Sequence, residues 1–207
     1  MYIHRDVRSL ANVKVLNKYM GFHNGFVAGG CFKNIFNGEK VKDVDIFFKC
    51  QEDFDEALRE FNSLTREYRF LYRNDRAVAF KCVNDGVVVE LVEHIFGLPE
   101  SIIDMFDFSI VKIAYYCVVD LKERKGKIIH RFNIVHHKSF FEHLFFKRLV
   151  IESTTLPFPL STFERALRYK GYGYNLCLES KHNLITAIKN SNNPEDALIE
   201  SLYYGFD

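Results

Sequence analysis

Two aspartates, Asp43 and Asp45, stand inside a run of strand-forming residues at positions 41–48. A strand of this composition is expected to be buried, and a buried carboxylate is unfavourable unless a cation or a hydrogen-bond donor lies beside it. Because side chains alternate along a strand, the two carboxylates project from the same face. Their oxygens can share hard divalent cations such as Mg²⁺, so the sequence predicts a metal site.

A double glycine, Gly29-Gly30, lies upstream of these aspartates, between the apolar run 26–28 and residues 31–37. The apolar run predicts a short strand, and the glycines predict a tight turn. Residues 31–37 predict a helix that ends at Gly38, a residue suited to the left-handed conformation. A turn that opens a helix has backbone N–H groups that can hold a phosphate, so Gly29 and Gly30 are predicted to bind one.

A third carboxylate, Glu90, interrupts the apolar run GVVVELV and follows an Asn-Asp-Gly hairpin signal at residues 84–86. The hairpin puts this strand in the same region of the sheet, so Glu90 is predicted to complete a two-metal site with Asp43 and Asp45. Glu93 lies on the opposite face of the strand and is the less favoured ligand.

Two ions about 4 Å apart stabilise the attacking and leaving oxygens of an in-line displacement. The implied reaction is attack of a hydroxyl on the α-phosphate of a nucleoside triphosphate, with pyrophosphate as the leaving group. An alternative keeps Glu90 as a structural acid paired with an arginine such as Arg69 or Arg76. Taken singly, a double glycine is also typical of an ordinary turn, and Asp-x-Asp of an exposed edge strand.

The pattern of elements predicts an α/β (α+β) protein in which helices flank a mixed sheet. After Ser139 the strand signal gives way to helical patterns, so the predicted boundary divides a head domain, residues 1–137, from a small helical domain, residues 138–207. Helices are predicted over 7–20 and 52–64, and strands over 68–72, 77–83 and 86–92.

Two signals predict helix starts in the C-terminal third. Ser161 and Glu164 have the spacing of a capping box. In this motif each of the two side chains accepts a hydrogen bond from the backbone N–H of the other residue. The Asn-Pro-Glu-Asp sequence at 193–196 predicts a last helix through residues 197–204.

The charge balance excludes some kinds of partner. The chain has 28 Lys and Arg against 27 Asp and Glu, so it predicts neither strong nonspecific nucleic-acid binding nor attachment to a membrane surface. The five cysteines form no Cys-x-x-Cys pair and are expected to be reduced. Neither a signal peptide nor a membrane span is recognisable, so a soluble, cytoplasmic protein without a membrane partner is expected.

The stretch FVAGGCFKNIFNG followed by DVDIF resembles the signature of the polymerase β superfamily of nucleotidyltransferases. It is most similar to tRNA nucleotidyltransferases (CCA-adding enzymes) and poly(A) polymerases. This resemblance implies a nucleotidyltransferase head followed by a helical neck. Lys33 and Asn34 stand where the family has an arginine and an aspartate, and the resemblance implies that Lys33 contacts the nucleotide.

The segment DFSIVKIAY, residues 107–115, is similar to the family's arginine-arginine-aspartate-phenylalanine-threonine segment, which contacts the sugar and phosphates. Asp107 and Ser109 match that segment, so the resemblance implies that Asp107 binds the nucleotide. Met105 and Phe106 replace its two arginines. An equal alternative is that Asp107 caps the helical segment that follows it.

The segment RALRYKGYGY, residues 165–174, is similar to the arginine-rich neck helix of the same family. The resemblance implies that Arg165 and Arg168 contact the nucleotide, while a solvated helix face is an equal alternative. Pro159 and Thr162 occupy the positions that read the base in CCA-adding enzymes, so no base preference carries over.

These patterns together predict a metal-dependent nucleotidyltransferase that transfers a nucleoside monophosphate to a hydroxyl, with two Mg²⁺ or Mn²⁺ ions. The resemblance favours an RNA 3′ end, such as that of tRNA, as acceptor; a small molecule or a protein hydroxyl is the alternative. The layout also resembles nucleotidyltransferase-like proteins of bacteriophages, which implies the host cytoplasm. Two other hypotheses stay open: a non-catalytic protein that acts on a host factor, and a toxin-like transferase. The oligomeric state also stays open.

Overall fold

The computed structural model describes residues 1–6, 10–124 and 127–191. The chain forms two compact units. The first consists of the described parts of Met1–Met105 and Lys112–Lys138, and the second of Phe106–Val111 and the described residues from Ser139 onward. The short segment Phe106–Val111 thus belongs to the second unit although the sequence around it belongs to the first. The division into two separate domains, residues 1–137 and 138–207, stays a prediction.

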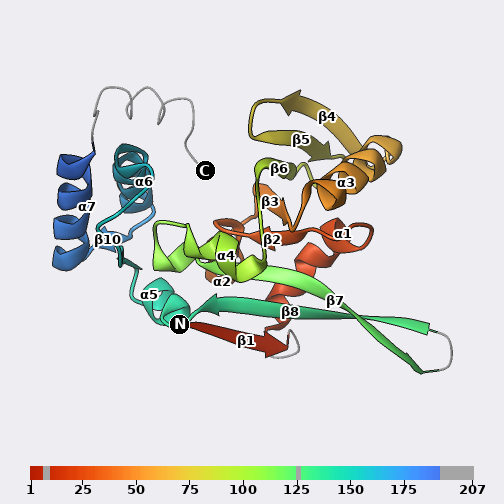
Figure 1. Ribbon diagram of the computed structural model, residues 1–207, viewed down its shortest axis with the longest axis horizontal. Helices are drawn as coiled ribbons and strands as arrows, with labels where there is room; N and C mark the ends of the chain where they lie inside the picture. The colour runs from red at the N-terminus through yellow and green to blue at the C-terminus, as the bar shows by residue number, and fades with distance from the viewer. Residues whose placement is uncertain (7–9, 125–126, 192–207) are drawn as a thin grey trace. The chain divides into compact units, whose positions relative to one another are not determined.

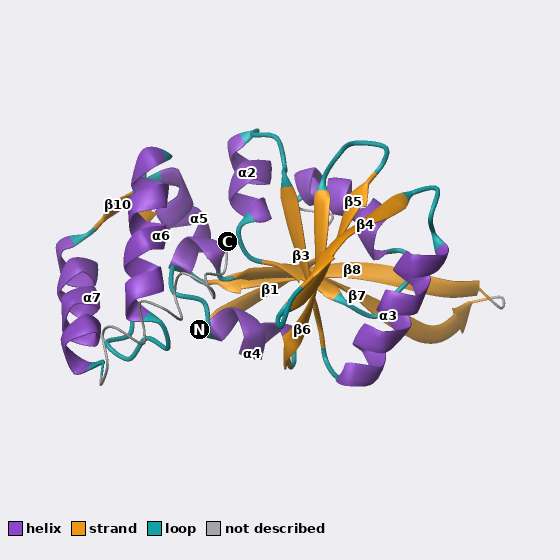
Figure 2. Cartoon of the chain, turned by 90° about the horizontal axis from the view of Figure 1, so that it is seen from above, coloured by secondary structure: helices purple, strands orange, loops and turns teal. Residues whose placement is uncertain are grey.

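The first unit is built on an eight-stranded mixed sheet, which confirms the predicted fold class (Figure 1, Figure 2). Neighbouring strands follow the order β1-β8-β7-β2-β3-β6-β5-β4, so β4 lies at one edge. Among the described strands of this sheet, only β3 and β6 pair in parallel. The strands are β1 (Tyr2–Asp6), β2 (Phe26–Ala28), β3 (Asp43–Phe48), β4 (Tyr68–Arg73), β5 (Ala77–Cys82), β6 (Val88–Phe96), β7 (Ile113–Arg124) and β8 (Lys127–His137).

Helix α3 (Gln51–Ser63) covers one face of this sheet and confirms the helix predicted there (Figure 2). Its apolar stripe includes Phe54 and Phe61, both fully buried. The Phe61 ring lies 5.2 Å, centroid to centroid, from the ring of Phe80 on β5. Because Phe80 pairs with Val89, these two side chains point to the face that α3 covers. Residues that alternate with them point to the other face.

The segment before β2 differs from the single helix predicted over 7–20. The described residues form a 3-10 helix, η2 (Ala11–Leu16), and one short turn of α-helix, α1 (Asn17–Met20). Val13 and Leu16, three residues apart, are fully buried. This spacing fits the three residues per turn of a 3-10 helix, so the apolar pattern is satisfied without a long α-helix. Residues 7–9 lie outside the described residues.

Two short helices complete the first unit. Helix α2 (Cys31–Asn37) confirms the helix predicted after the double glycine, and it ends at Gly38, whose φ of 71° is left-handed. Helix α4 (Pro99–Asp104) has a proline in its first turn, where the missing N–H costs no helical hydrogen bond.

The second unit is mainly helical, as predicted for the C-terminal third. The capping box predicted at Ser161 is wrong, because α6 already begins at Pro159 and Ser161 lies inside it. The proline favours the first helical position, which moves the start two residues earlier. The helix predicted over 197–204 lies outside the described residues. Among the residues that the structure describes, no helix is long and apolar enough to span a membrane. The elements are η3 (Ser109–Val111), α5 (Phe140–Phe145), β9 (Arg148–Leu149), α6 (Pro159–Gly171), β10 (Asn175–Leu176) and α7 (Leu178–Asn190).

Close packing at the start of β2 leads to a first prediction. A Cβ added at Gly25 would lie 2.6 Å from Cγ2 of Ile46 and 2.7 Å from Cε1 of Phe48, two fully buried side chains. We expect Gly25→Ala to lower the free energy of unfolding by about 2–3 kcal/mol, measured by urea unfolding. Gly21→Ala is the matched control, because its new Cβ would meet only the Asn17 carbonyl, at 3.8 Å. Equal unfolding midpoints for the two variants would contradict the prediction.

Candidate active site

The three predicted metal-ligating carboxylates lie on one face of two adjacent strands. Asp45 on β3 pairs with Glu90 on β6 in the parallel register, and Asp43 lies two residues before Asp45. Paired residues of neighbouring strands point to the same side, as do residues two apart along a strand. Glu90 neighbours Val89, which points toward α3, so the carboxylates occupy the face opposite that helix.

Small side chains flank the carboxylates along this row. Ala28 on β2 pairs with Asp45, and Ala79 on β5 pairs with Glu90. Ala114 on β7 pairs in turn with Ala28. All three alanines are fully buried. Because Ala79 extends no further than a methyl group, it leaves a gap through which a side chain from the next strand can reach Glu90.

Tyr72 on the edge strand β4 reaches the carboxylates across this gap. It pairs with Ala79, and its hydroxyl donates a hydrogen bond to Oε1 of Glu90 at 2.5 Å. Burial, the bond to Glu90 and the charges of Glu90, Asp45 and Asp43 raise the pKa of Tyr72. The phenol is therefore protonated at neutral pH and stands close to all three acids.

A β-bulge explains why the sequence pattern does not point to Tyr72. Simple alternation would put Phe70 and Tyr72 on the same face of β4. The register instead shifts between them, so Phe70 pairs with Phe80 while Tyr72 pairs with Ala79. One extra residue in β4 thus turns Tyr72 to the carboxylate face, and bulges commonly re-aim a side chain in this way.

Glu93 faces away from the carboxylates, as predicted. Its two oxygens accept hydrogen bonds from Nη2 and Nε of Arg73, at 2.7 and 3.2 Å. Tyr72 and Arg73, consecutive in β4, therefore hold Glu90 and Glu93 on opposite faces. The hydrogen-bond partner seen for Glu90 is a tyrosine rather than the Arg69 or Arg76 of the alternative hypothesis.

The double glycine forms the predicted turn between β2 and α2. Gly29 has a φ of 96°, a conformation open to glycine at little cost, and its N–H donates to the carbonyl of Ile113 at 3.2 Å. Gly30 precedes the first residue of α2, and no side chain caps that end. Cys31 follows, and burial together with the charges of Asp45 and Asp43 raises the pKa of its thiol. The turn thus lies beside the carboxylates.

Lys33, predicted to contact the nucleotide, is buried and forms an ion pair. Its Nζ lies 2.7 Å from Oε2 of Glu39, in the loop that leads into β3. Lys33 is only 7% exposed, whereas Glu39 is 47% exposed. The ammonium group therefore joins α2 to the loop before Asp43.

The other predicted nucleotide-binding residues lie in the second unit. Oδ2 of Asp107 is 3.3 Å from Nη1 of Arg165 on α6, and both side chains are nearly buried, at 7% and 12% exposure. Oδ1 of Asp107 accepts a hydrogen bond from the N–H of Phe108 at 2.8 Å. Arg168 on the same helix is exposed. The structure thus brings Asp107 and Arg165 together as a nearly buried ion pair within the second unit.

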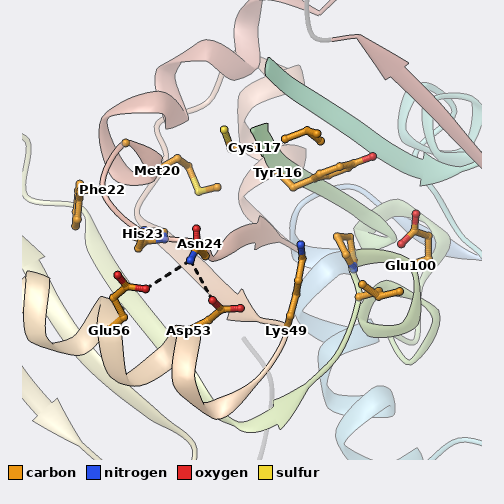
Figure 3. Close-up of a pocket in the computed structure, with 14 residues that line it drawn as sticks. Met20, Phe22, His23, Asn24, Lys49, Asp53, Glu56, Glu100, Tyr116 and Cys117 are labelled. Carbon is orange, nitrogen blue, oxygen red and sulfur yellow. Dashed lines mark hydrogen bonds between the residues drawn. The ribbon is translucent and has the colours of Figure 1, made fainter. Parts of the chain in front are cut away.

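A hollow of about 730 Å³ lies in the first unit, at the opposite ends of β2 and β3 from Gly29 and Asp43 (Figure 3). Asn24, before β2, and Lys49, after β3, contribute to its wall. Nδ2 of Asn24 donates to Oδ1 of Asp53 at 3.1 Å. This hollow is therefore distinct from the carboxylate face.

His23, which also lines this hollow, has both ring nitrogens engaged. Nε2 is 2.7 Å from the carbonyl of Tyr19, and Nδ1 accepts from the N–H of Gly25 at 3.0 Å. Burial lowers the pKa of His23 to about 4, while the bond to Tyr19 opposes this shift. The ring is neutral at pH 7 and serves the local backbone.

In the part of the chain that the structure describes, no group of three His, Cys, Asp or Glu side chains is gathered closely enough to hold a metal ion. Asp43, Asp45 and Glu90 share a face, but their role as metal ligands stays a prediction.

Solved structures of CCA-adding enzymes are similar to this chain. The Thermotoga maritima CCA-adding enzyme complexed with tRNA has a TM-score of 0.61 and 16% identity, and the match covers 100% of this chain and 52% of that one. A CCA-adding enzyme with CTP has a TM-score of 0.62 at 16% identity, over 98% of this chain and 51% of that one. A tRNA nucleotidyltransferase with a primer tRNA and an ATP analogue has a TM-score of 0.56 at 19% identity, and the match covers 92% of this chain and 55% of that one.

The chain spans about half the length of these enzymes. At this level of identity the similarity concerns the fold, and it confirms the polymerase β-like nucleotidyltransferase fold that the sequence predicts. No curated protein sequence matches the chain. The sequence profile of the Gabija anti-defense 2 (Gad2) family matches residues 6–147 of the chain. The chain therefore belongs to this family.

Proposed function

We propose that the protein is a metal-dependent nucleotidyltransferase, which transfers a nucleoside monophosphate from a nucleoside triphosphate to a hydroxyl group. The observation that carries this proposal is the register of β3 and β6, which pairs Asp45 with Glu90 and leaves Asp43 on the same face. The Gly29-Gly30 turn beside them adds support. Three carboxylates suit hard divalent cations, so Asp43, Asp45 and Glu90 would hold two Mg²⁺ or Mn²⁺ ions.

Each residue then has a defined part in the reaction. The Gly29-Gly30 turn and Lys33 would hold the triphosphate, Gly30 through its backbone N–H group and Lys33 through its ammonium group, while Gly29, whose N–H bonds to Ile113, would shape the turn. Glu90 would accept the proton of the attacking hydroxyl, whose oxygen forms the new bond to the α-phosphorus while pyrophosphate leaves. When bound, the metal ions would neutralise the charge that develops on the phosphate oxygens. In the second unit, Asp107, Arg165 and Arg168 are proposed nucleotide contacts.

We propose an RNA 3′ end as the acceptor. Two of the similar structures are complexes with tRNA, one of which also contains an ATP analogue, and another contains CTP. The site of action would be the host cytoplasm if the protein is encoded by a phage, a source compatible with the anti-defence role that the family description names.

A second candidate function is action on a host defence factor, either without catalysis or by attaching a nucleotide to that factor. The family description favours this candidate, since it names an anti-defence role. The Asp107–Arg165 pair is compatible with it, because two of the proposed nucleotide-binding side chains already satisfy each other. The two candidates differ in the acceptor and in whether any transfer takes place.

Transfer of label tests the proposed function. The protein is incubated with each nucleoside triphosphate labelled at the α-phosphate, Mg²⁺ or Mn²⁺, and either tRNA or a cell extract. We expect label to move to RNA, and Asp43→Asn/Asp45→Asn to reduce this transfer at least about 1,000-fold. Label on a host protein instead would favour the second candidate.

Asp55→Asn is the matched control for this experiment. Asp55 is an exposed acid on α3, and its Oδ1 accepts a hydrogen bond from Gln51 one turn earlier on the same helix. The control should transfer label at the wild-type rate. The proposed enzymatic function fails if no label moves to any acceptor and the wild-type protein binds no nucleotide in a metal-dependent way.

A further inference from the structure

The hydroxyl of Tyr72 is held against Glu90, one of the three carboxylates of the candidate site. It lies 2.5 Å from Oε1 of Glu90, the group that the proposed function assigns to proton acceptance. Glu90 in turn pairs with Asp45 across the parallel strands. A candidate base must lie within hydrogen-bond reach of the proton donor, about 2.6–3.2 Å, and this contact of 2.5 Å is slightly shorter than that range.

Tyr72 is also accessible. Its side chain is 41% exposed, and β4 is an edge strand of the sheet. Tyr19, in contrast, donates to Asp85 at 2.7 Å but is only 2% exposed. Tyr72 therefore has both an accessible side chain and a hydrogen bond to one of the three site acids.

We propose that Tyr72 is itself a nucleotide acceptor, so that the protein attaches a nucleoside monophosphate to its own Tyr72 hydroxyl. This inference rests on the proposed function, since it uses the same carboxylates and the same nucleoside triphosphate. It adds a substrate class, the phenolic hydroxyl of a tyrosine, and it needs no external acceptor.

The reaction balances with groups already named. Tyr72 Oη attacks the α-phosphorus, and its proton passes to the Glu90 carboxylate. The bond between the α-phosphorus and the bridging oxygen breaks, and pyrophosphate leaves with the electron pair. The product is a phosphodiester between the nucleoside and the tyrosine oxygen.

The β-bulge gives this placement a specific structural cause. Without the register shift between Phe70 and Tyr72, the Tyr72 side chain would point to the face that α3 covers. The methyl side chain of Ala79, between Tyr72 and Glu90, lets the phenol cross one strand to the acid. A hydroxyl held in this way is in reach of the carboxylates before any acceptor binds, which raises its effective concentration.

The experiment uses the full chain without RNA. Purified protein is incubated with each of the four nucleoside triphosphates and Mg²⁺ or Mn²⁺, and is then examined by intact mass and peptide mapping. We expect a gain of one nucleoside monophosphate on the peptide that contains Tyr72. The rate constant should not depend on protein concentration, because the transfer takes place within one molecule.

Three variants make the test decisive. Tyr72→Phe removes only the hydroxyl and should abolish the modification while metal-dependent nucleotide binding persists. Asp43→Asn/Asp45→Asn should also abolish it. Tyr172→Phe, which removes a hydroxyl from a 52% exposed tyrosine of the second unit, should leave the modification unchanged.

The outcomes separate this inference from the proposed function. Label on RNA with an unmodified Tyr72 overturns the inference and leaves the proposed function standing; Tyr72 would then only orient Glu90. Modification at another residue also overturns the inference. The absence of both label transfer and metal-dependent nucleotide binding overturns the inference together with the proposed function.

Discussion

Replacing Glu90 with glutamine is expected to lower the rate of nucleotidyl transfer at least about 1,000-fold while the protein stays folded. The amide has nearly the same shape as the carboxylate, and its oxygen can still accept the hydrogen bond from Tyr72. It cannot accept a proton from an attacking hydroxyl, and it is a poorer ligand for a hard divalent cation. Transfer of an α-labelled nucleotide under single-turnover conditions measures the loss.

The free energy of unfolding should change by no more than about 1 kcal/mol in this variant. Glu90 has two acids beside it, Asp45 and Asp43, so neutralising it removes a repulsive charge in the absence of metal. Urea unfolding without divalent cations measures this change. A large loss of stability would mean that the charge of Glu90 is structural.

Glu93→Gln is the matched control, since Glu93 belongs to the same strand but faces the other way and bonds to Arg73. This variant should keep the wild-type rate of transfer and lose only part of the Arg73 interaction. Equal rates for Glu90→Gln and the wild type would remove Glu90 from the catalytic proposal. A loss confined to Glu93→Gln would assign the chemistry to the opposite face of the sheet.

In the second unit, Asp107→Ala is expected to lower the free energy of unfolding by about 3–5 kcal/mol. The substitution leaves Arg165 nearly buried without the carboxylate that lies 3.3 Å away. It also removes the acceptor for the N–H of Phe108. Thermal or urea unfolding, followed by a probe in the second unit, measures the loss.

Two further variants test whether loss of the ion pair causes the lower stability of Asp107→Ala. Lys170→Ala removes an exposed basic side chain from the same helix and should change the free energy of unfolding by no more than about 0.5 kcal/mol. Asp107→Leu/Arg165→Met removes both charges and should recover much of the stability, because apolar side chains can replace a buried ion pair. If Asp107→Ala were as stable as the wild type, the ion pair would contribute nothing to folding.

The same double variant addresses nucleotide binding. If Asp107 and Arg165 contact the nucleotide, as their resemblance to the family segment implies, the folded double variant should bind nucleotide more weakly than the wild type. An unchanged Kd, measured with Mg²⁺ present, would assign the pair to folding of the second unit alone.

Local patterns were sufficient for most elements of the first unit. Strand β2, helix α2 with its left-handed Gly38, and helix α3 all lie where the sequence predicts them. Each depends on neighbours in the chain: a short apolar run, a glycine after a helix, or an apolar stripe of helical period. The predictions failed where two local signals competed. Pro159 starts α6 before Ser161 can cap it, and a 3-10 helix satisfies the apolar spacing of Val13 and Leu16.

The pairing of Asp107 with Arg165 is a different case. The sequence identified both residues, each through its resemblance to a separate family segment, but 57 intervening positions hide their contact. Only packing within the second unit brings α6 against the Asp107 segment. An ion pair between such distant residues has no periodic signal in the sequence.

For the candidate site, the sequence by itself determined the double-glycine turn and the shared face of Asp43 and Asp45, because alternation and turn chemistry act over a few residues. The tertiary structure decided the rest. It paired Asp45 with Glu90 across parallel strands and, through the bulge in β4, turned Tyr72 to the same face. Strand register depends on contacts between distant segments, and a shift of one residue reverses the face of a side chain.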